Sequence, residues 1–121
     1  MFFDAKTSGI EIIHFGERTA TNGDVRLLST PEQWDGMGQL VKRTVDAAGN
    51  KITTVLAYPE HNFEYSIVAQ EVEGAYKISV NLDKPLPANM VGKAGFNLEF
   101  LPSVYWDKAF LMDDVPGQFP R

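Results

Sequence analysis

The fold class is decided by one stretch of the sequence, Gly95-Phe96-Asn97-Leu98-Glu99-Phe100-Leu101-Pro102-Ser103. In an extended chain Phe96, Leu98 and Phe100 point to one face, and we expect that face to be core. The intervening Asn97 and Glu99 point to the other face. The Pro-Ser pair that follows ends the strand sharply. One dry face and one polar face are typical of a strand in an antiparallel sheet.

Similar short segments recur along the chain at intervals of roughly 8–12 residues, with turn signals between them. We expect further strands at residues 10–15, 25–29, 40–45, 51–58, 63–68 and 76–82. Within Thr19–Asp24, the Asn22-Gly23 pair favours a tight turn between the first two strands. Thr30–Trp34 has the capping pattern of one helical turn. The sequence therefore predicts an all-β antiparallel sandwich, jelly-roll or immunoglobulin-like, with at most one or two short helical turns.

Length and composition indicate one globular domain, residues 1–121, because 121 residues with 44% hydrophobic content can bury a core. The net charge of −5 disfavours nucleic acid as a partner. The absence of cysteine excludes disulfides and thiolate metal sites. No apolar run reaches the roughly 20 residues that a membrane span needs. Residues 116–121 look like the start of a connection, so we expect a module excised from a longer chain.

Signatures of catalysis and of metal binding are weak. Asp113-Asp114 offers oxygen ligands for a structural calcium ion, but no EF-hand spacing supports it, so we predict no cofactor and no metal. The two histidines, His14 and His61, lack the spacing of metal ligands. Glu99 can be paired with other acids, but a solvated sheet face explains it more simply. We expect the module itself not to be an enzyme.

The aromatic residues are more informative, because sugar rings present apolar C–H faces that stack on flat aromatic side chains. Amides and carboxylates then bind the sugar hydroxyls. Two tryptophans and one tyrosine stand in loop-like contexts, and three polar residues lie on the predicted strands. The candidate glycan-binding residues are therefore Trp106, Tyr105, Trp34, Asn97, Glu99 and Asn81. The alternative is that both tryptophans cap the core or dock onto a neighbouring domain.

The second half of the chain, from about Tyr58 to Arg121, resembles a segment of multidomain bacterial glycoside hydrolases. The closest resemblance is to the family nine cellulase-type enzymes of Bacteroidetes. The residues that carry it are Tyr58-Pro59-Glu60, Asn62-Phe63, Leu82-Asp83-Lys84-Pro85-Leu86-Pro87, Gly92-Lys93-Ala94-Gly95-Phe96-Asn97-Leu98-Glu99-Phe100-Leu101-Pro102, Lys108-Ala109-Phe110-Leu111-Met112-Asp113 and Gly117-Gln118-Phe119-Pro120-Arg121. In those proteins the pattern lies upstream of the catalytic barrel, in a non-catalytic β-sandwich region.

The resemblance implies an accessory role in an exported polysaccharide-degrading protein, located outside the cell, in the periplasm or on the cell surface. Catalytic carboxylates of those enzymes belong to an all-helical barrel, so no catalytic residue is carried over. Two roles compete: binding of a polysaccharide or oligosaccharide, or structural docking onto the catalytic domain of the same chain, with Trp106 and Phe110 in the interface. A third reading is a small independent enzyme that uses Glu99 or a histidine.

Overall fold

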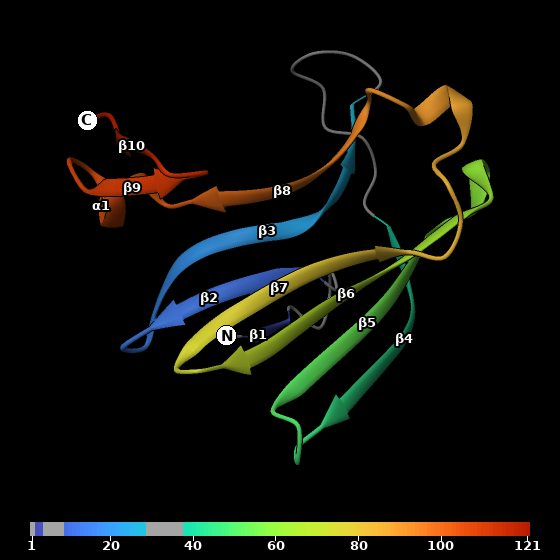
Figure 1. Ribbon diagram of the computed structural model, residues 1–121, viewed down its shortest axis with the longest axis horizontal. Coiled ribbons are helices and arrows are strands. Elements are labelled where there is room, and N and C mark those ends of the chain that lie inside the picture. Colours follow the sequence, from blue (N-terminus) through green and yellow to red (C-terminus); the bar gives the residue numbers. More distant parts are fainter. Residues whose placement is uncertain (1, 4–8, 29–37) are drawn as a thin grey trace.

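The structure is a computed structural model that describes residues 2–3, 9–28 and 38–121. It is an all-β sandwich, as the strand pattern predicts, and its strand pairings are antiparallel. The first sheet, sheet A, contains in spatial order β1 (Phe2–Phe3), β2 (Ile10–His14), β3 (Glu17–Leu27) and β8 (Ala94–Phe100). The second, sheet B, is a meander of β4 (Gln39–Asp46), β5 (Lys51–Tyr58), β6 (Phe63–Val72) and β7 (Ala75–Leu82). A separate hairpin joins β9 (Ala109–Met112) to β10 (Val115–Gln118) (Figure 1).

Helical structure in the described part of the chain is limited to three single turns, where the sequence predicts one or two at most. They are the 3-10 turns η1 (Pro59–His61) and η2 (Ala88–Met90) and the α-helical turn α1 (Pro102–Tyr105). Proline opens both η1 and α1, since its fixed φ suits the first helical position. The turn predicted at Thr30–Trp34 lies outside the described residues. No helix among residues 2–3, 9–28 and 38–121 has the length and apolarity that crossing a membrane requires.

Sheet B agrees closely with the sequence pattern. Strand β5 has the predicted bounds. The sequence predicts the loop before it at residues 46–50, and the structure has it at 47–50, with Asp46 as the last residue of β4. One side of β5 is buried: Thr54 and Leu56 are fully covered, and Tyr58 is 2% exposed. This agreement reflects local information, because strict alternation and a short polar turn together define a hairpin.

The first hairpin corrects the sequence prediction. The turn between β2 and β3 is made by Phe15 and Gly16, whose φ angles are 49° and 83°, and not by Thr19–Asp24. Asn22 has a φ of 54° but lies inside β3, where the pairing register shifts toward both neighbouring strands. A Cβ atom at Gly23 would lie 2.8 Å from the Cβ of Ile10. The Asn-Gly pair therefore serves a β-bulge and a close strand approach, which need the same backbone freedom as a tight turn.

The expectation that Phe96, Leu98 and Phe100 form core is wrong for the two phenylalanines. Phe96 is 40% exposed and Phe100 is 41% exposed, while Leu98 is half-buried. The alternation is present, but among the described strands β8 is the outer strand of sheet A and pairs only with β3 (Figure 1). One flank of β8 is therefore open, so a side chain on its apolar face is not covered from all sides.

The core lies between the two sheets and contains a buried polar contact. Its buried members are Ile10, Val25, Leu27, Leu56, Tyr58, Phe63, Tyr65, Ile67, Ala69 and Met90. From sheet B, the Tyr58 hydroxyl donates to the Val25 carbonyl at 2.8 Å, and the Tyr65 hydroxyl donates to Asp24 Oδ1 at 2.7 Å. Asp24 is fully buried and also accepts from the Val25 backbone N–H at 2.7 Å. These bonds fix β3 against sheet B.

Burial also sets the protonation states in this cluster. Desolvation raises the pKa of the Asp24 carboxyl above its ordinary value. Three smaller effects lower this pKa without cancelling the rise: the hydrogen bond from Tyr65, the hydrogen bond from Val25 and the charge of Arg26. Burial, followed by the charge of Asp24, raises the pKa of Tyr58 to about 12 and raises that of Tyr65 as well. Both hydroxyls therefore remain protonated donors at neutral pH.

Replacing Tyr65 by Phe should destabilise the sandwich by about 1–2 kcal/mol, because Asp24 then loses a buried hydrogen-bond donor. The free energy of unfolding in urea measures this. Tyr76→Phe is the matched control, since Tyr76 is 63% exposed and its change should stay within about 0.5 kcal/mol. Equal effects of the two substitutions would contradict the role of the Tyr65 hydroxyl.

Asp24→Asn should remove part of the pH dependence of stability. The folded protein holds the Asp24 proton to a higher pH than the unfolded chain, because the folded-state pKa is raised. In that interval the folded state binds more protons, so stability falls as pH rises through the folded-state pKa. Asparagine keeps the Oδ1 acceptor and does not titrate. Unfolding measured from about pH 4 to about pH 8 should show this decline in the parent only; identical profiles would refute the assignment.

Candidate functional site

An aromatic pocket of about 250 Å³ lies where β8 leads into α1. It is lined by Phe100, Pro102, Tyr105, Trp106, Phe119 and Pro120. We call it the aromatic pocket. Trp106 follows α1 directly and is 54% exposed, whereas Tyr105 and Phe119 are half-buried. The pocket therefore presents one open indole beside more enclosed rings.

Backbone hydrogen bonds hold the pocket to sheet A. The N–H of Leu101 donates to the Thr19 carbonyl at 3.0 Å, which ties the end of β8 to β3. The Trp106 N–H donates to the Pro102 carbonyl at 2.9 Å and closes the helical turn. The Phe119 N–H donates to the Lys108 carbonyl at 3.0 Å, so the segment after β10 returns to the pocket.

Ring contacts fill the base of the pocket. Phe119 is the centre, with its ring centroid 5.4 Å from Phe100, 5.2 Å from Tyr105 and 4.9 Å from Phe110. Phe100 and Tyr105 meet edge to face at 5.0 Å. These distances lie in the range of favourable aromatic pairs. The base is therefore held by packing, and a ligand would meet ring surfaces that are already oriented.

Charged residues follow two of the lining residues in the chain: Asp107 and Lys108 come after Trp106, and Arg121 comes after Pro120. Arg121 Nε forms an ion pair with Asp107 Oδ2 at 2.7 Å, and Gln118 Nε2 donates to the Asp107 carbonyl at 3.0 Å. The Lys108 ammonium lies 6.0 Å from the centroid of the Tyr105 ring. Flat apolar faces beside polar groups suit an amphiphilic ligand, whose ring face stacks and whose polar groups form hydrogen bonds.

The structure brings only part of the predicted glycan set together. Tyr105 and Trp106 share the aromatic pocket, whereas Asn81 lies on β7 in the other sheet, opposite Ser66. Asn97 and Glu99 lie on β8, but successive residues of a strand point to opposite faces, so they face away from Phe100. Trp34 lies outside the described residues.

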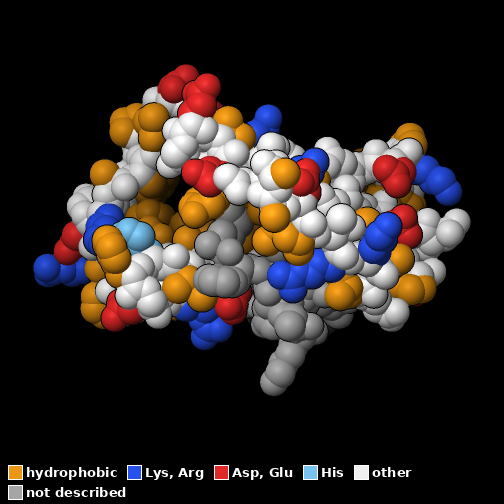
Figure 2. All heavy atoms as spheres, turned by 90° about the horizontal axis from the view of Figure 1, so that it is seen from below, with side chains coloured by type: hydrophobic (Ala, Val, Ile, Leu, Met, Phe, Trp, Pro, Cys, Tyr) orange, Lys and Arg blue, Asp and Glu red, His pale blue; other side chains and the backbone are white. Residues whose placement is uncertain are grey.

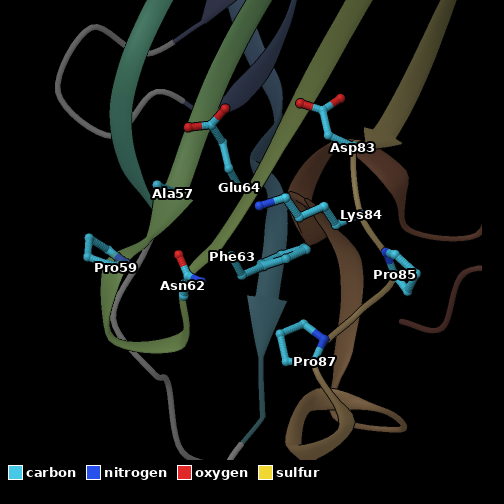
Figure 3. A pocket seen from close by; sticks show the side chains of 9 residues that line it. All are labelled: Ala57, Pro59, Asn62, Phe63, Glu64, Asp83, Lys84, Pro85 and Pro87. Carbon is cyan, nitrogen blue, oxygen red and sulfur yellow. The ribbon is translucent and has the colours of Figure 1, made fainter.

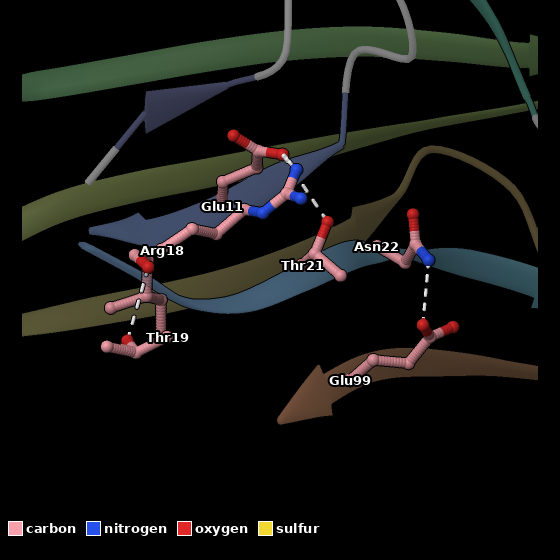
Figure 4. Close-up of polar contacts among 7 residues, drawn as sticks. Glu11, Arg18, Thr19, Thr21, Asn22 and Glu99 are labelled. Atoms are coloured by element: carbon pink, nitrogen blue, oxygen red, sulfur yellow. Dashed lines mark hydrogen bonds and ion pairs between the residues drawn. The ribbon is translucent and has the colours of Figure 1, made fainter. Parts of the chain in front are cut away.

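Asn97 and Glu99 are engaged with each other and with Asn22. The Asn22 amide donates to Glu99 Oε2 at 2.8 Å (Figure 4). The Asn97 amide donates to Glu99 Oε1 at 3.3 Å. On the neighbouring strands, Glu11 accepts from Arg18 at 2.9 Å and from Thr21 at 3.4 Å. This face of sheet A is thus a connected polar surface whose carboxylates already have partners.

The other candidates for chemistry are dispersed. His14 is exposed at the end of β2, and His61 lies in η1 with its Nδ1 3.5 Å from the Asn89 amide. Among residues 2–3, 9–28 and 38–121 no group of three His, Asp or Glu side chains is arranged to hold a metal ion. The predicted absence of metal and cofactor stays a prediction.

Besides two prolines, the aromatic pocket contains two aromatic residues that the sequence does not predict for the site, Phe100 and Phe119. The alternation predicts Phe100 in the core, because it identifies a face of the strand without showing what covers that face. Phe119 lies in a Gly-Gln-Phe-Pro-Arg segment with no strand or helix signal of its own. Phe119 reaches Phe100 because the segment after β10 runs back beside Lys108, where the Phe119 N–H donates to the Lys108 carbonyl.

Comparisons of the chain with protein-family models, with curated proteins and with solved structures find no match. The resemblance to a module of glycoside hydrolases therefore stays a prediction.

Phe119→Ala should loosen the aromatic pocket, because it removes the ring that contacts Phe100, Tyr105 and Phe110. Phe119 is half-buried, so we expect a loss of about 1–3 kcal/mol, below that of a fully buried ring. Hydrogen exchange of residues 101–118 should accelerate with it. Leu111→Ala, at a residue 68% exposed, is the control and should leave exchange unchanged. Unchanged exchange in the Phe119 variant would exclude a central packing role.

Proposed function

We propose that this chain is a non-catalytic carbohydrate-binding module of an exported polysaccharide-degrading glycoside hydrolase. The observation that carries the proposal is the aromatic pocket, in which an indole 54% exposed lies beside Tyr105 and above packed rings. Burying an exposed aromatic ring against a ligand contributes favourably to the free energy of binding, and no long, flexible side chain has to be ordered.

The chemistry of the pocket favours a sugar over other ligands. The apolar C–H face of a pyranose fits the open ring of Trp106, and its hydroxyls can bond to the polar groups around Asp107, Lys108 and Arg121. A wholly apolar ligand would make no hydrogen bonds with these polar groups. A polyanion would be repelled by the chain, which carries a net charge of −5.

The site of this proposal is narrower than the one that the sequence predicts. It keeps Trp106 and Tyr105 and adds Phe100 and Phe119. It leaves out Asn97 and Glu99, because their hydrogen-bonding groups bond to each other and to Asn22. The same bonds favour the non-catalytic reading, since a catalytic carboxylate must reach the substrate.

The exported location and the parent hydrolase rest on the resemblance alone. A polysaccharide outside the cell is the ligand that such a module would meet. The catalytic domain of the same chain would be its second partner.

Structural docking is the second candidate function, and exposed apolar residues on the C-terminal hairpin favour it. Leu111 is 68% exposed, Met112 66% and Val115 64%. In the space-filling view, apolar side chains are exposed at several places on one face, among them the left end and the middle (Figure 2). Clustered apolar surface is typical of contact with another protein surface, which would be the catalytic domain in this reading.

Affinity gel electrophoresis in soluble β-glucans and xylans tests the proposed function. We expect the parent chain to be retarded in at least one of these gels and Trp106→Ala to weaken the interaction by about tenfold or more, as loss of a central aromatic anchor does. Tyr76→Ala is the control, because it removes an aromatic residue 63% exposed on sheet B.

The outcomes separate the two functions. Retardation that Trp106→Ala abolishes and Tyr76→Ala preserves supports glycan binding at the aromatic pocket. Unretarded migration of the folded parent chain in every gel rejects glycan binding and leaves docking as the better proposal.

A further inference from the structure

A second pocket, of about 450 Å³, lies at the end of sheet B where β6 begins and β7 ends (Figure 3). We call it the polar pocket. It is lined by Ala57, Pro59, Asn62, Phe63, Glu64, Asp83, Lys84, Pro85 and Pro87. Two separate segments of the sequence meet here, residues 57–64 and residues 83–87. The fold therefore builds this pocket from stretches that the aromatic pocket does not use.

The walls of the polar pocket are fixed by local structure. Asn62 adopts a φ of 47°, and its N–H donates to the Pro59 carbonyl at 3.0 Å. Phe63 is 4% exposed and anchors the start of β6 in the core. On the other side, the Pro87 carbonyl accepts from the N–H of Met90 at 2.8 Å, and Met90 is 2% exposed. Proline-fixed and anchored walls lower the ordering cost of binding.

Figure 3 shows the carboxylates of Glu64 and Asp83 at the same edge of the lining residues, with the Lys84 side chain below them and extending toward the strand of Glu64. The Asn62 amide adds one donor group and one acceptor. The side chains of the pocket thus offer two anionic acceptors, a cationic donor and an amide, while prolines supply apolar surface.

This combination selects a class of ligand. Phosphate and other anions are disfavoured by the two carboxylates, and an apolar ligand would strip water from four polar groups without replacing it. A polyhydroxylated ring can donate to the carboxylates, accept from Lys84 and lay its C–H groups on the prolines. The volume of about 450 Å³ is in the range of small-molecule sites.

We propose that the polar pocket is a second ligand site and binds a pyranose residue of a neutral saccharide. It shares its ligand class with the proposed function but none of its residues. The aromatic pocket would hold a sugar by stacking, whereas the polar pocket holds one through charge-assisted hydrogen bonds from hydroxyls to Glu64 and Asp83. Either site can fail without the other.

Nuclear magnetic resonance on the full ¹⁵N-labelled chain tests the proposal. Cellotetraose and xylotetraose are titrated at neutral pH, and the backbone amides of residues 62–64 and 83–84 report on the polar pocket. The Trp106 indole N–H reports on the aromatic pocket. We expect at least one sugar to shift the first group of signals, and Glu64→Gln with Asp83→Asn to weaken that binding by about tenfold or more.

A charge-matched control replaces Glu17 and Glu73, two exposed acids in the β2–β3 and β6–β7 hairpins, by glutamine. It changes the net charge equally and should leave the affinity unchanged. Trp106→Ala removes the exposed ring of the aromatic pocket and should preserve the shifts at residues 62–64 and 83–84. Loss of those shifts in this variant would mean one site only and would overturn the proposal.

Two further outcomes would overturn it. One is that neither sugar shifts the signals of residues 62–64 and 83–84 at millimolar concentration, whatever happens at Trp106. The other is that Nα-acetyl-lysine methylamide shifts them while both sugars do not, which would assign the carboxylates to a cationic ligand. Shifts at Trp106 alone would leave the proposed function standing and reject the second site.

Discussion

The hydrogen bond from the Tyr65 hydroxyl to the buried Asp24 carboxyl is the contact on which the arrangement of the sheets depends. Apolar packing alone tolerates small slides of one sheet over the other, because it has no direction. A buried carboxyl without its donor is costly, so this bond selects one position of β3 over β6. A Cβ atom at Gly38 would collide with the same hydroxyl, so a residue without a side chain stands there.

The position of β3 determines where the candidate site lies, because β3 pairs with β8 and β8 leads into α1. The Leu101 N–H bond to Thr19 continues this connection to the aromatic pocket. As the outer strand of its sheet, β8 keeps Phe100 at 41% exposure, and the rings of Tyr105 and Phe119 can therefore reach it. The same open flank that leaves the apolar face of β8 incompletely covered thus supplies the base of the pocket.

Local features of the fold could be predicted from the sequence, and non-local ones could not. Alternation over residues 51–58 and a polar turn before it define a hairpin without reference to the rest of the chain. Asn22-Gly23 could not be assigned from the sequence alone, since a bulge and a turn require the same backbone conformation. The exposure of Phe100 could not be predicted either, because it depends on the order of the strands in the sheet. Tyr105 and Trp106 were found by their loop context, but Phe119 reaches them only through tertiary structure.

Hydrogen-bond accounting separates polar residues that complete the fold from those that remain available to a ligand. Asn97 and Glu99 look like a binding platform in the sequence, yet both bond within a network that includes Asn22. A ligand at Glu99 would have to replace bonds of 2.8 and 3.3 Å, so its net gain would be small. The carboxylates of Glu64 and Asp83 are exposed around a hollow between proline-fixed walls. In our proposal, a sugar there would exchange water for directed hydrogen bonds to these carboxylates. Whether a carboxylate lies beside a pocket is therefore more informative than its residue type.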